Sequence, residues 1–428
     1  GNGSCCYSVL YIKGHVAPSQ YTKLFFSPDK DNLNPISYLP IKKIISNYNR
    51  SYHSLIYPKN YPYISIKNID SSILWIYMDI NMDTPDLHII PEFIKLISEI
   101  DEFKGKWQAL SSLSPERLAL LRHVATIESV GSSTRIEGAK LTDSEVEKLF
   151  SGLSTTSFKS RDEEEIAGYA EAMELIFESY NEIPNDENHI KQIHQILLRY
   201  SSKDTRHRGD YKKSPNHVEA FGENGKSLGI IFETASPFDT PFMVSDLIKW
   251  FNEESKKVKL HSLLLIAIFL VRFLAIHPFQ DGNGRLSRIL TTLMLLKAGY
   301  LYVPYSSLEK VIEDNKDQYY LALRRAQSTI YTDNGKLNEW ILFFLQSLRR
   351  QVSVLEIKIQ TEKVIEQLPP LSQEIVRIAA QHGKVAVRDA ERITGANRNT
   401  IKVHISELVR RGRLKMLGKG KGTWYKLP

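Results

Sequence analysis

Cysteine is almost absent from this sequence of 428 residues. The only two cysteines, Cys5 and Cys6, are adjacent, and neighbouring cysteines rarely form a disulfide with each other. The sequence therefore implies neither a disulfide framework nor a zinc cluster. Long apolar runs are missing as well. No stretch reaches about 18 uninterrupted apolar residues, so no transmembrane helix and no membrane partner are expected.

A secretion signal is also not recognisable. The chain does not open with a basic segment followed by an apolar core, which argues against export, and we expect a cytoplasmic protein. Hydrophobic residues make up 42% of the chain and charged residues 25%, values typical of a soluble globular protein. The length suggests two or three domains.

Residues 1–86 form an N-terminal segment of uncertain nature. Hydrophobic periodicity is weak there, and short alternating patches at 63–66 and 73–77 predict strands. The first methionine is Met78. One interpretation is that the native protein starts at Met78 or Met82, and the alternative is a small accessory domain. We assign no function to this segment.

The most informative stretch runs from His277 to Arg288 and reads HPFQDGNGRLSR. It follows the apolar run 263–276, which Arg272 alone interrupts, and this run predicts a buried core helix. Pro278 cannot continue that helix and ends it just after His277. A catalytic or binding loop is therefore expected directly after the core helix.

A second helix is predicted from about Arg285 to Leu296, with Gly299 as its C-cap. The turn 281–284 opens onto its N-terminus, an arrangement that binds anions well. Arg285 and Arg288 fall in the first turn, where the helix dipole disfavours cations. Two arginines at this place therefore indicate a bound anion.

The residue types in this stretch suggest phosphate chemistry. The carboxylate of Asp281 suits Mg²⁺ beside phosphates, the turn Gly282-Asn283-Gly284 can cradle a pyrophosphate, and Arg285 and Arg288 can bind phosphate oxygens. His277 is a candidate general base. Taken one at a time, these residues are equally well explained by a core histidine followed by an ordinary turn. Their combination within twelve positions favours a phosphate site.

The pattern HPFxDGNGRxxR resembles the signature of Fic-domain proteins, which usually transfer AMP from ATP to a hydroxyl side chain of a target protein. The resemblance implies that His277 deprotonates the target hydroxyl and that Asp281 holds Mg²⁺. It also implies that Gly282, Asn283, Gly284, Arg285 and Arg288 bind the phosphates. Relatives that transfer a different phosphate group carry lysine at the position of Gly284. The resemblance covers residues 87–350.

A helix at about 115–138 precedes this core, with Ser114 as its N-cap and Pro115 at its first position. At its end, Glu137 is a poor charge for a helix C-terminus, so an arginine partner is expected. Ser133 to Gly138 fits the pattern [S/T]xxxE[G/N] and resembles the inhibitory helix of Fic proteins. The resemblance implies that Glu137 pairs with Arg288 and occupies the γ-phosphate site.

The rest of the region 87–350 predicts a mostly α fold with one β-hairpin. Apolar residues at helical spacing predict further helices at about 87–108, 141–150, 162–177, 189–200, 243–252, 316–327 and 337–350. Two apolar patches, at 218 and 230–232, flank a Gly- and Asn-rich loop and predict the hairpin.

The resemblance gives this hairpin a role as the flap (about 214–234), whose backbone pairs with the target segment. Without the resemblance, a simple surface excursion explains the hairpin equally well. The resemblance also implies that Tyr319, Tyr320 and Gln327 lie beside the adenine, where packing within the helical core is the alternative.

Residues 371–428 form a small basic domain after a linker helix at 351–370. From Lys384 to Lys426 there are 12 Lys or Arg and three Asp or Glu, a balance of +9 that exceeds the +7 of the whole chain. Three predicted helices followed by a hairpin resemble a winged helix-turn-helix. Its candidate DNA contacts are Arg398, Asn399, Lys402, Arg410 and Arg411. Protein contact is the alternative use of this domain.

Two functions remain open from sequence. The first is a protein adenylyltransferase that uses ATP and Mg²⁺ and is autoinhibited through Glu137, with a protein substrate docked on the flap. The second is a DNA-binding transcriptional regulator whose Fic core senses nucleotide, but a sensor has no need of His277. Removal of AMP by the same site is a variant of the first. A homo-oligomer is a further open possibility, since no interface is legible.

Overall fold

The computed structural model describes residues 87–109, 113–151, 158–221, 227–330, 336–366 and 368–427. The strands predicted at 63–66 and 73–77 and the alternative starts at Met78 and Met82 lie outside them. The described residues are mostly helical, with two small antiparallel sheets, so the mostly α prediction is confirmed. None of the helices that they form is both long and apolar enough to cross a membrane.

Helix α8 (Ser262–Ile276) is the core of the large helical region. Every residue from Leu263 to Ile276 is buried except Arg272, whose guanidinium carbon lies 4.6 Å from the ring centroid of Trp250. Helices α7 (Thr240–Lys257), α9 (Asn283–Lys297), α11 (Lys316–Gln327) and α12 (Leu337–Glu366) all pack on α8. The long apolar run of the sequence is thus surrounded by other helices.

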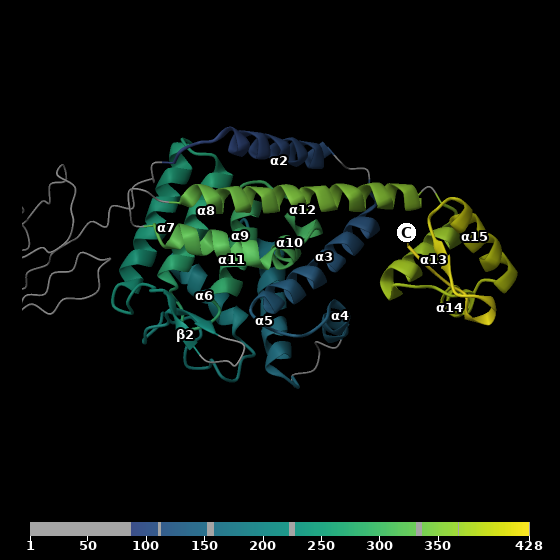
Figure 1. Cartoon of the computed structure of the whole chain (residues 1–428), viewed down its shortest axis with the longest axis horizontal. Coiled ribbons are helices and arrows are strands. Elements are labelled where there is room, and N and C mark those ends of the chain that lie inside the picture. The colour runs from purple at the N-terminus through teal and green to yellow at the C-terminus, as the bar shows by residue number, and fades with distance from the viewer. Residues whose placement is uncertain are drawn as a thin grey trace, which may run out of the picture. The chain divides into compact units, whose positions relative to one another are not determined.

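Further helices complete this region, and α2 lies beside the long helix α12 (Figure 1). Helix α3 packs on both α5 and α10, and α5 packs in turn on α6 and α9. The bounds of these elements are α2 Pro91–Ala109, α3 Pro115–Ile136, α4 Asp143–Ser151, α5 Arg161–Ser179, α6 Glu187–Leu197, α10 Leu308–Asp314 and the 3-10 helix η1 Val303–Tyr305.

The prediction of a separate linker helix at 351–370 is wrong, because α12 continues without a break from Leu337 to Glu366. Its buried positions Leu348, Val352, Leu355 and Ile359 form one stripe that crosses the predicted boundary. At that boundary the buried amide Nε2 of Gln351 donates to the carbonyl of Ser306 at 2.5 Å. A polar residue at position 351 therefore joins the core instead of ending the helix.

The predicted hairpin is present as β1 (Val218–Phe221) and β2 (Ser227–Phe232). The strands are antiparallel, with Val218 opposite Phe232 and irregular register on either side of the central pairs. The glycine- and asparagine-rich part of the connecting loop, 222–226, lies outside the described residues.

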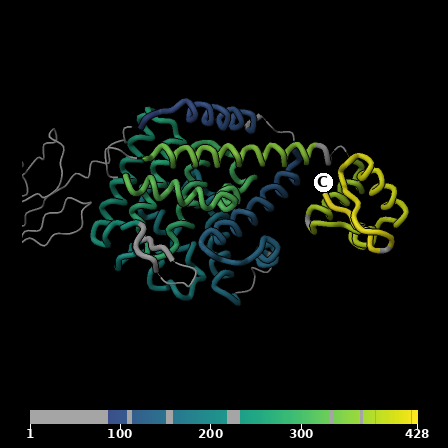
Figure 2. Tube along the Cα trace, viewed as in Figure 1, coloured from purple at the N-terminus to yellow at the C-terminus, as the bar shows by residue number. Residues whose placement is uncertain are grey.

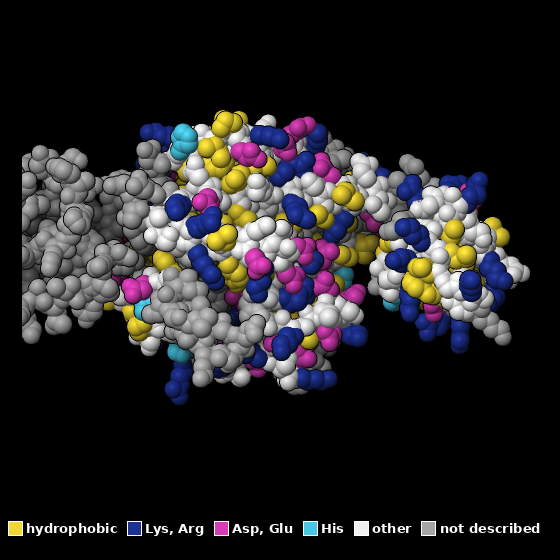
Figure 3. Space-filling model, viewed as in Figure 1, with side chains coloured by type: hydrophobic (Ala, Val, Ile, Leu, Met, Phe, Trp, Pro, Cys, Tyr) yellow, Lys and Arg dark blue, Asp and Glu magenta, His cyan; other side chains and the backbone are white. Residues whose placement is uncertain are grey.

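The C-terminal domain contains α13 (Pro370–His382), α14 (Val387–Thr394), α15 (Arg398–Arg410), β3 (Lys415–Leu417) and β4 (Trp424–Lys426). These elements have a hydrophobic core of their own, to which Ile375, Ile401 and Ile405 contribute. Figure 2 shows the domain in yellow, and Figure 3 shows dark blue Lys and Arg side chains gathered on its surface. Val385 forms an isolated antiparallel bridge to Tyr425, and α14 begins two residues later at Val387.

The continuity of α12 gives a stability prediction. Leu355→Ala removes a side chain that is 0% exposed and should lower the free energy of unfolding by about 2–5 kcal/mol. The matched change Ile357→Ala affects a side chain that is 67% exposed and should stay within about 0.5 kcal/mol. Urea unfolding followed by circular dichroism measures both. Equal effects of the two changes would contradict a continuous buried stripe.

Candidate active site

His277 is the C-cap of α8 and has a left-handed backbone with φ of 53°. Pro278 prevents further helix, and the His277 N–H still donates to the Phe273 carbonyl at 2.9 Å. The side-chain Nδ1 lies 3.4 Å from the Leu274 carbonyl, so Nδ1 carries the hydrogen and Nε2 keeps its lone pair. This is the tautomer that a general base needs.

The imidazole of His277 is held in its neutral form. Burial and the nearby Lys212 ammonium lower its pKa from the ordinary 6.5 to about 4, although Glu137 and Asp281 act in the opposite direction. At neutral pH the side chain can therefore accept a proton.

The loop after His277 is more helical than predicted. Gly282 is the N-cap of α9 with φ of 81°, and Asn283 and Gly284 already belong to the first turn of the helix. The buried Asn283 side chain accepts from the Phe279 N–H at 2.9 Å and donates to the Phe279 carbonyl at 2.7 Å. Asn283 thus shapes the loop with its side chain, and its backbone N–H is left to face a ligand.

His194 of α6 supports the same loop, although the sequence does not predict this role. Its Nδ1 accepts from the Gly209 N–H and its Nε2–H donates to the Asp281 carbonyl, both at 3.0 Å. The ring stacks on Phe279 with centroids 3.8 Å apart, and burial lowers its pKa to about 4. The sequence signal is one of two histidines in an amphipathic helix, a pattern common to many core histidines.

Arg288 contacts the end of α3, and the predicted pairing with Glu137 is present. Its Nη2 lies 2.7 Å from Glu137 Oε1, while Nε donates to Ser133 Oγ at 2.8 Å and Nη2 to the Ser133 carbonyl at 2.9 Å. The next residue, Gly138, has φ of 107°, which lets the chain turn after Glu137. A Cβ at Gly284 would lie 2.2 Å from Glu137 Oε1, so glycine there permits the contact.

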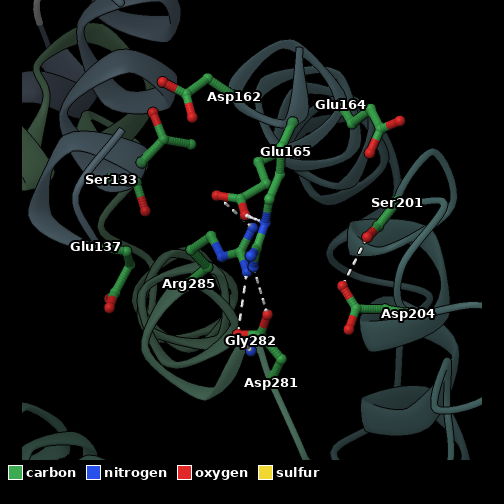
Figure 4. Close-up of polar contacts among 12 residues, drawn as sticks. Ser133, Glu137, Asp162, Glu164, Glu165, Ser201, Asp204, Asp281, Gly282 and Arg285 are labelled. Carbon is green, nitrogen blue, oxygen red and sulfur yellow. Dashed lines mark hydrogen bonds and ion pairs between the residues drawn. The ribbon is translucent and has the colours of Figure 1, made fainter. Parts of the chain in front are cut away.

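Arg285 is also buried and also paired with carboxylates, as Figure 4 shows. Its Nη1 lies 3.0 Å from Glu165 Oε2 and its Nη2 lies 3.4 Å from Asp281 Oδ1. Arg161 binds the same two acids, at 2.7 Å from Glu165 and 2.9 Å from Asp281. The sequence does not reveal Glu165 and Arg161 as site residues, because compensation of the helix dipole already explains the acidic start of α5.

The site fits an anion. Arg285 Nε and Arg288 Nη1 are buried and find no hydrogen-bond acceptor among the described residues, and buried guanidinium donors without acceptors are costly. Phosphate oxygens at the N-terminus of α9 would accept from both.

The site also fits magnesium in its phosphate-bound form. Asp281 Oδ1 accepts from the Gly282 N–H at 2.6 Å and Oδ2 is bound by Arg161. Within the described part of the chain, no three His, Cys, Asp or Glu side chains form a metal-binding group. One carboxylate is enough for Mg²⁺ when phosphates and water supply the other ligands.

The three predicted adenine residues differ in exposure. Tyr319 is only 4% exposed and packs against Tyr320, Trp340 and Phe343, and Gln327 is buried as well. Tyr320 is half-buried, and its hydroxyl lies 3.3 Å from the Ile136 carbonyl at the end of α3. Of the three, Tyr320 offers the most surface for a base.

The predicted DNA contacts lie on or next to α15. Asn399 and Lys402 are exposed on the face opposite the buried Ile401 and Ile405. The arginines have acidic partners within the domain: Arg398 lies 3.4 Å from Glu391, and Arg410 and Arg411 lie 2.6 and 2.5 Å from Glu407.

The site thus combines a neutral histidine with two buried arginines near a helix N-terminus, within a mostly helical fold, and this combination is suited to binding phosphate. Residues 184–295 match the Fic/DOC family. This segment of the chain is a Fic/DOC domain, and it contains the loop from His277 to Arg288.

Named relatives agree with this assignment. The chain is 28% identical over 274 residues to the protein adenylyltransferase Fic of Aedes aegypti, covering 63% of this chain and 49% of that protein. It is 23% identical over 210 residues to a probable protein adenylyltransferase of Aquifex aeolicus, covering 45% of this chain and 62% of that protein. The chain therefore spans about half the length of the first of these relatives and less than two thirds of the second.

Solved structures share the fold. A Fic family protein from Desulfovibrio desulfuricans has a TM-score of 0.52 at 23% identity, covering 81% of this chain and 98% of that one. A Fic domain containing signaling protein from Bacteroides thetaiotaomicron has a TM-score of 0.50 at 26% identity, covering 64% of this chain and 97% of that one.

The low pKa of His277 is directly testable. In protein labelled with ¹³C at histidine ring carbons, the His277 signal, assigned by its loss in His277→Ala, should still report a neutral ring at pH 5.5. Free histidine in the same buffer serves as the reference, with half-protonation at about pH 6.5. Half-protonation of His277 near pH 6.5 would contradict the burial and charge environment described above.

Proposed function

We propose that this protein transfers AMP from ATP to a hydroxyl side chain of a target protein. The observation that carries the proposal is the joint placement of a neutral His277 and the buried arginines 285 and 288 around the N-terminus of α9. The relatives are named as protein adenylyltransferases, which supports the same reaction. ATP as donor agrees with a cytoplasmic location.

His277 is the general base of the proposed reaction. Its Nε2 takes the proton of the target hydroxyl while the hydroxyl oxygen bonds to the α-phosphorus of ATP. The bond from the α-phosphorus to the bridging oxygen breaks, and pyrophosphate leaves. Arg285, Arg288 and the backbone N–H groups of Gly282, Asn283 and Gly284 bind the phosphates and stabilise the charge that develops.

Asp281 is the proposed ligand of Mg²⁺, which supplies charge neutralisation at the phosphates. Arg161 bonds to Asp281 Oδ2 and would share this carboxylate with the metal. Tyr320 is the proposed contact for the adenine ring, with Tyr319 and Gln327 behind it.

Glu137 holds the resting protein in an inhibited state in this proposal. Its carboxylate occupies the Arg288 Nη2 that a γ-phosphate requires, so bound ATP cannot reach a productive position. Ser133 and Gly138 act with Glu137, the former by binding Arg288 and the latter by ending α3. The target docks on the flap (about 214–234) through backbone pairing with the hairpin.

A second proposed function belongs to the C-terminal domain, for which we propose the bounds 371–428. We propose 87–350 for the Fic region, and its last helix, α12, continues beyond that bound to Glu366. The exposed basic face of α15, with Asn399 and Lys402 on it, supports DNA binding through a winged helix-turn-helix. Arg410 and Arg411 at the end of the helix suit phosphate contact.

The inhibited state predicts a gain of activity on Glu137→Gly. Transfer of label from α-labelled ATP to protein should rise about 10- to 100-fold, because the resting state loses a charge-assisted hydrogen bond of roughly 1.5–3 kcal/mol. The matched control Glu145→Gly removes an exposed carboxylate of α4 and should change nothing. The assay uses purified protein with Mg²⁺, alone and with cell lysate.

Adding His277→Ala to Glu137→Gly should abolish labelling while ATP binding persists, because only the base is removed. Labelling that survives His277→Ala would refute the base assignment. No label with Glu137→Gly would refute AMP transfer and favour the nucleotide-sensing regulator, and release of AMP from a pre-modified protein would favour the removal reaction.

DNA binding predicts a salt effect for the double variant Arg410→Ala with Arg411→Ala. The slope of log affinity against log salt should fall by about 0.9 for each DNA phosphate that the variant no longer neutralises. The control Arg350→Ala removes an exposed arginine of α12, outside the domain. An unchanged slope would refute the assignment of these two arginines, and no DNA binding by the intact protein would favour protein contact as the use of the domain.

A further inference from the structure

Lys212 is a buried cation that the proposed reaction does not use. The residue is 3% exposed, and its Nζ donates to Asn216 Oδ1 at 2.8 Å, Thr234 Oγ1 at 2.9 Å and the Ile276 carbonyl at 3.0 Å. An ammonium group has three N–H donors, so each is used. All three acceptors are neutral, and among the described residues no carboxylate forms an ion pair with Lys212. A buried charge held this way is costly, and burial lowers the pKa of Lys212 from the ordinary 10.5 to about 7.

Two of these acceptors mark the two ends of the flap hairpin. Asn216 lies two residues before β1, and Thr234 lies two residues after β2. Thr234 Oγ1 also donates to Asn216 Oδ1 at 3.0 Å. Lys212 therefore closes the base of the hairpin, where both of its ends meet one ammonium group.

The same network holds the backbone around His277. Asn216 Nδ2 donates to the carbonyls of His277 at 3.2 Å and Phe279 at 2.6 Å, and the Lys212 N–H donates to the Pro278 carbonyl at 2.9 Å. With the Ile276 carbonyl, four consecutive carbonyls from 276 to 279 are bound by Lys212 or Asn216.

These bonds explain how His277 keeps an unfavourable backbone conformation. A positive φ is costly for a residue other than glycine, and such conformations persist where surrounding contacts over-determine them. The carbonyls on both sides of the His277 Cα are fixed by side chains from the base of the flap.

We propose that Lys212, acting through Asn216 and Thr234, is a positioning residue that fixes the flap and the His277 backbone to each other. A target segment paired with the flap then presents its hydroxyl at a constant distance from His277 Nε2. This inference rests on the proposed AMP transfer and adds the element that links target docking to the base.

The charge of Lys212 supports the proposal. After burial, the Lys212 ammonium is the main cause that lowers the pKa of His277, whereas the Leu274 carbonyl and the charges of Glu137 and Asp281 raise it. Because the pKa of Lys212 is itself lowered to about 7, the ammonium is present in the acidic range in which His277 titrates. The network thus places the base and also favours its neutral form.

Lys212→Met tests the proposal, because methionine fills a similar volume without N–H donors. The adjacent Lys213 is exposed and pairs with Asp210 at 3.1 Å, so Lys213→Met is the matched control. In the Glu137→Gly background, Lys212→Met should lower kcat for transfer about 10- to 100-fold, the cost of a small misplacement of the base. The KM for ATP should stay unchanged, and Lys213→Met should behave like its parent.

A second readout does not depend on the reaction. In Lys212→Met, the ¹³C signal of His277 should shift and titrate at higher pH than in the parent, and amides of 218–221 should exchange hydrogen faster. If the parent transfers no AMP, the proposed function fails, but these two measurements still decide the positioning role.

Unchanged His277 titration and amide exchange in Lys212→Met would overturn the proposal, and so would an equal loss of ATP binding and transfer. If Lys212→Met does not fold, the isosteric Thr234→Val removes one acceptor of the network and takes the same tests. Parental behaviour of Thr234→Val would then overturn it.

Discussion

The structure depends on the burial of two arginines near the N-terminus of a helix, where the helix dipole disfavours positive charge. Arg285 and Arg288 are 2% and 4% exposed and are the third and sixth residues of α9, near the end where the helix dipole is positive. Carboxylates from two other helices offset this cost: Glu165 from α5 and Glu137 from the end of α3. The need to bring these acids to α9 constrains how α3 and α5 pack against it.

This constraint links stability to the proposed regulation. A guanidinium group that bonds to a carboxylate cannot use the same N–H for a phosphate, so the resting protein is stabilised by contacts that a nucleotide must replace. Arg285 Nε and Arg288 Nη1 have no acceptor within the described part of the chain, so in the proposed function they are donors that a phosphate can use without displacing a carboxylate. In the proposed function, inhibition is therefore a consequence of how the buried arginines are accommodated in the folded state.

Much of this organisation is predictable from sequence, because its signals are local. The apolar run of α8, the proline after His277 and the turn at Gly282 identify the core and the loop, and the family resemblance supplies the contact between Glu137 and Arg288. Long-range partners give no such signal. The acceptors of Lys212 lie 4, 22 and 64 residues away, and Gln351 bonds to a residue 45 positions away. Such polar residues resemble surface residues until the fold brings their partners together.

The buried cations of the site fall into two kinds, and the difference lies in their partners. The arginines are paired with side-chain carboxylates, which phosphate oxygens can replace as acceptors of the same sign of charge. Lys212 is bound to two side-chain oxygens and a backbone carbonyl, all neutral, so an incoming anion would have to break the base of the flap to reach it. His277 lies between these two groups. Its electrostatic partners on the α9 side can change as nucleotide binds, while its position is determined from the flap side by bonds that do not take part in that exchange. In the proposed function, this separation lets the site admit a nucleotide while the base keeps its strained conformation.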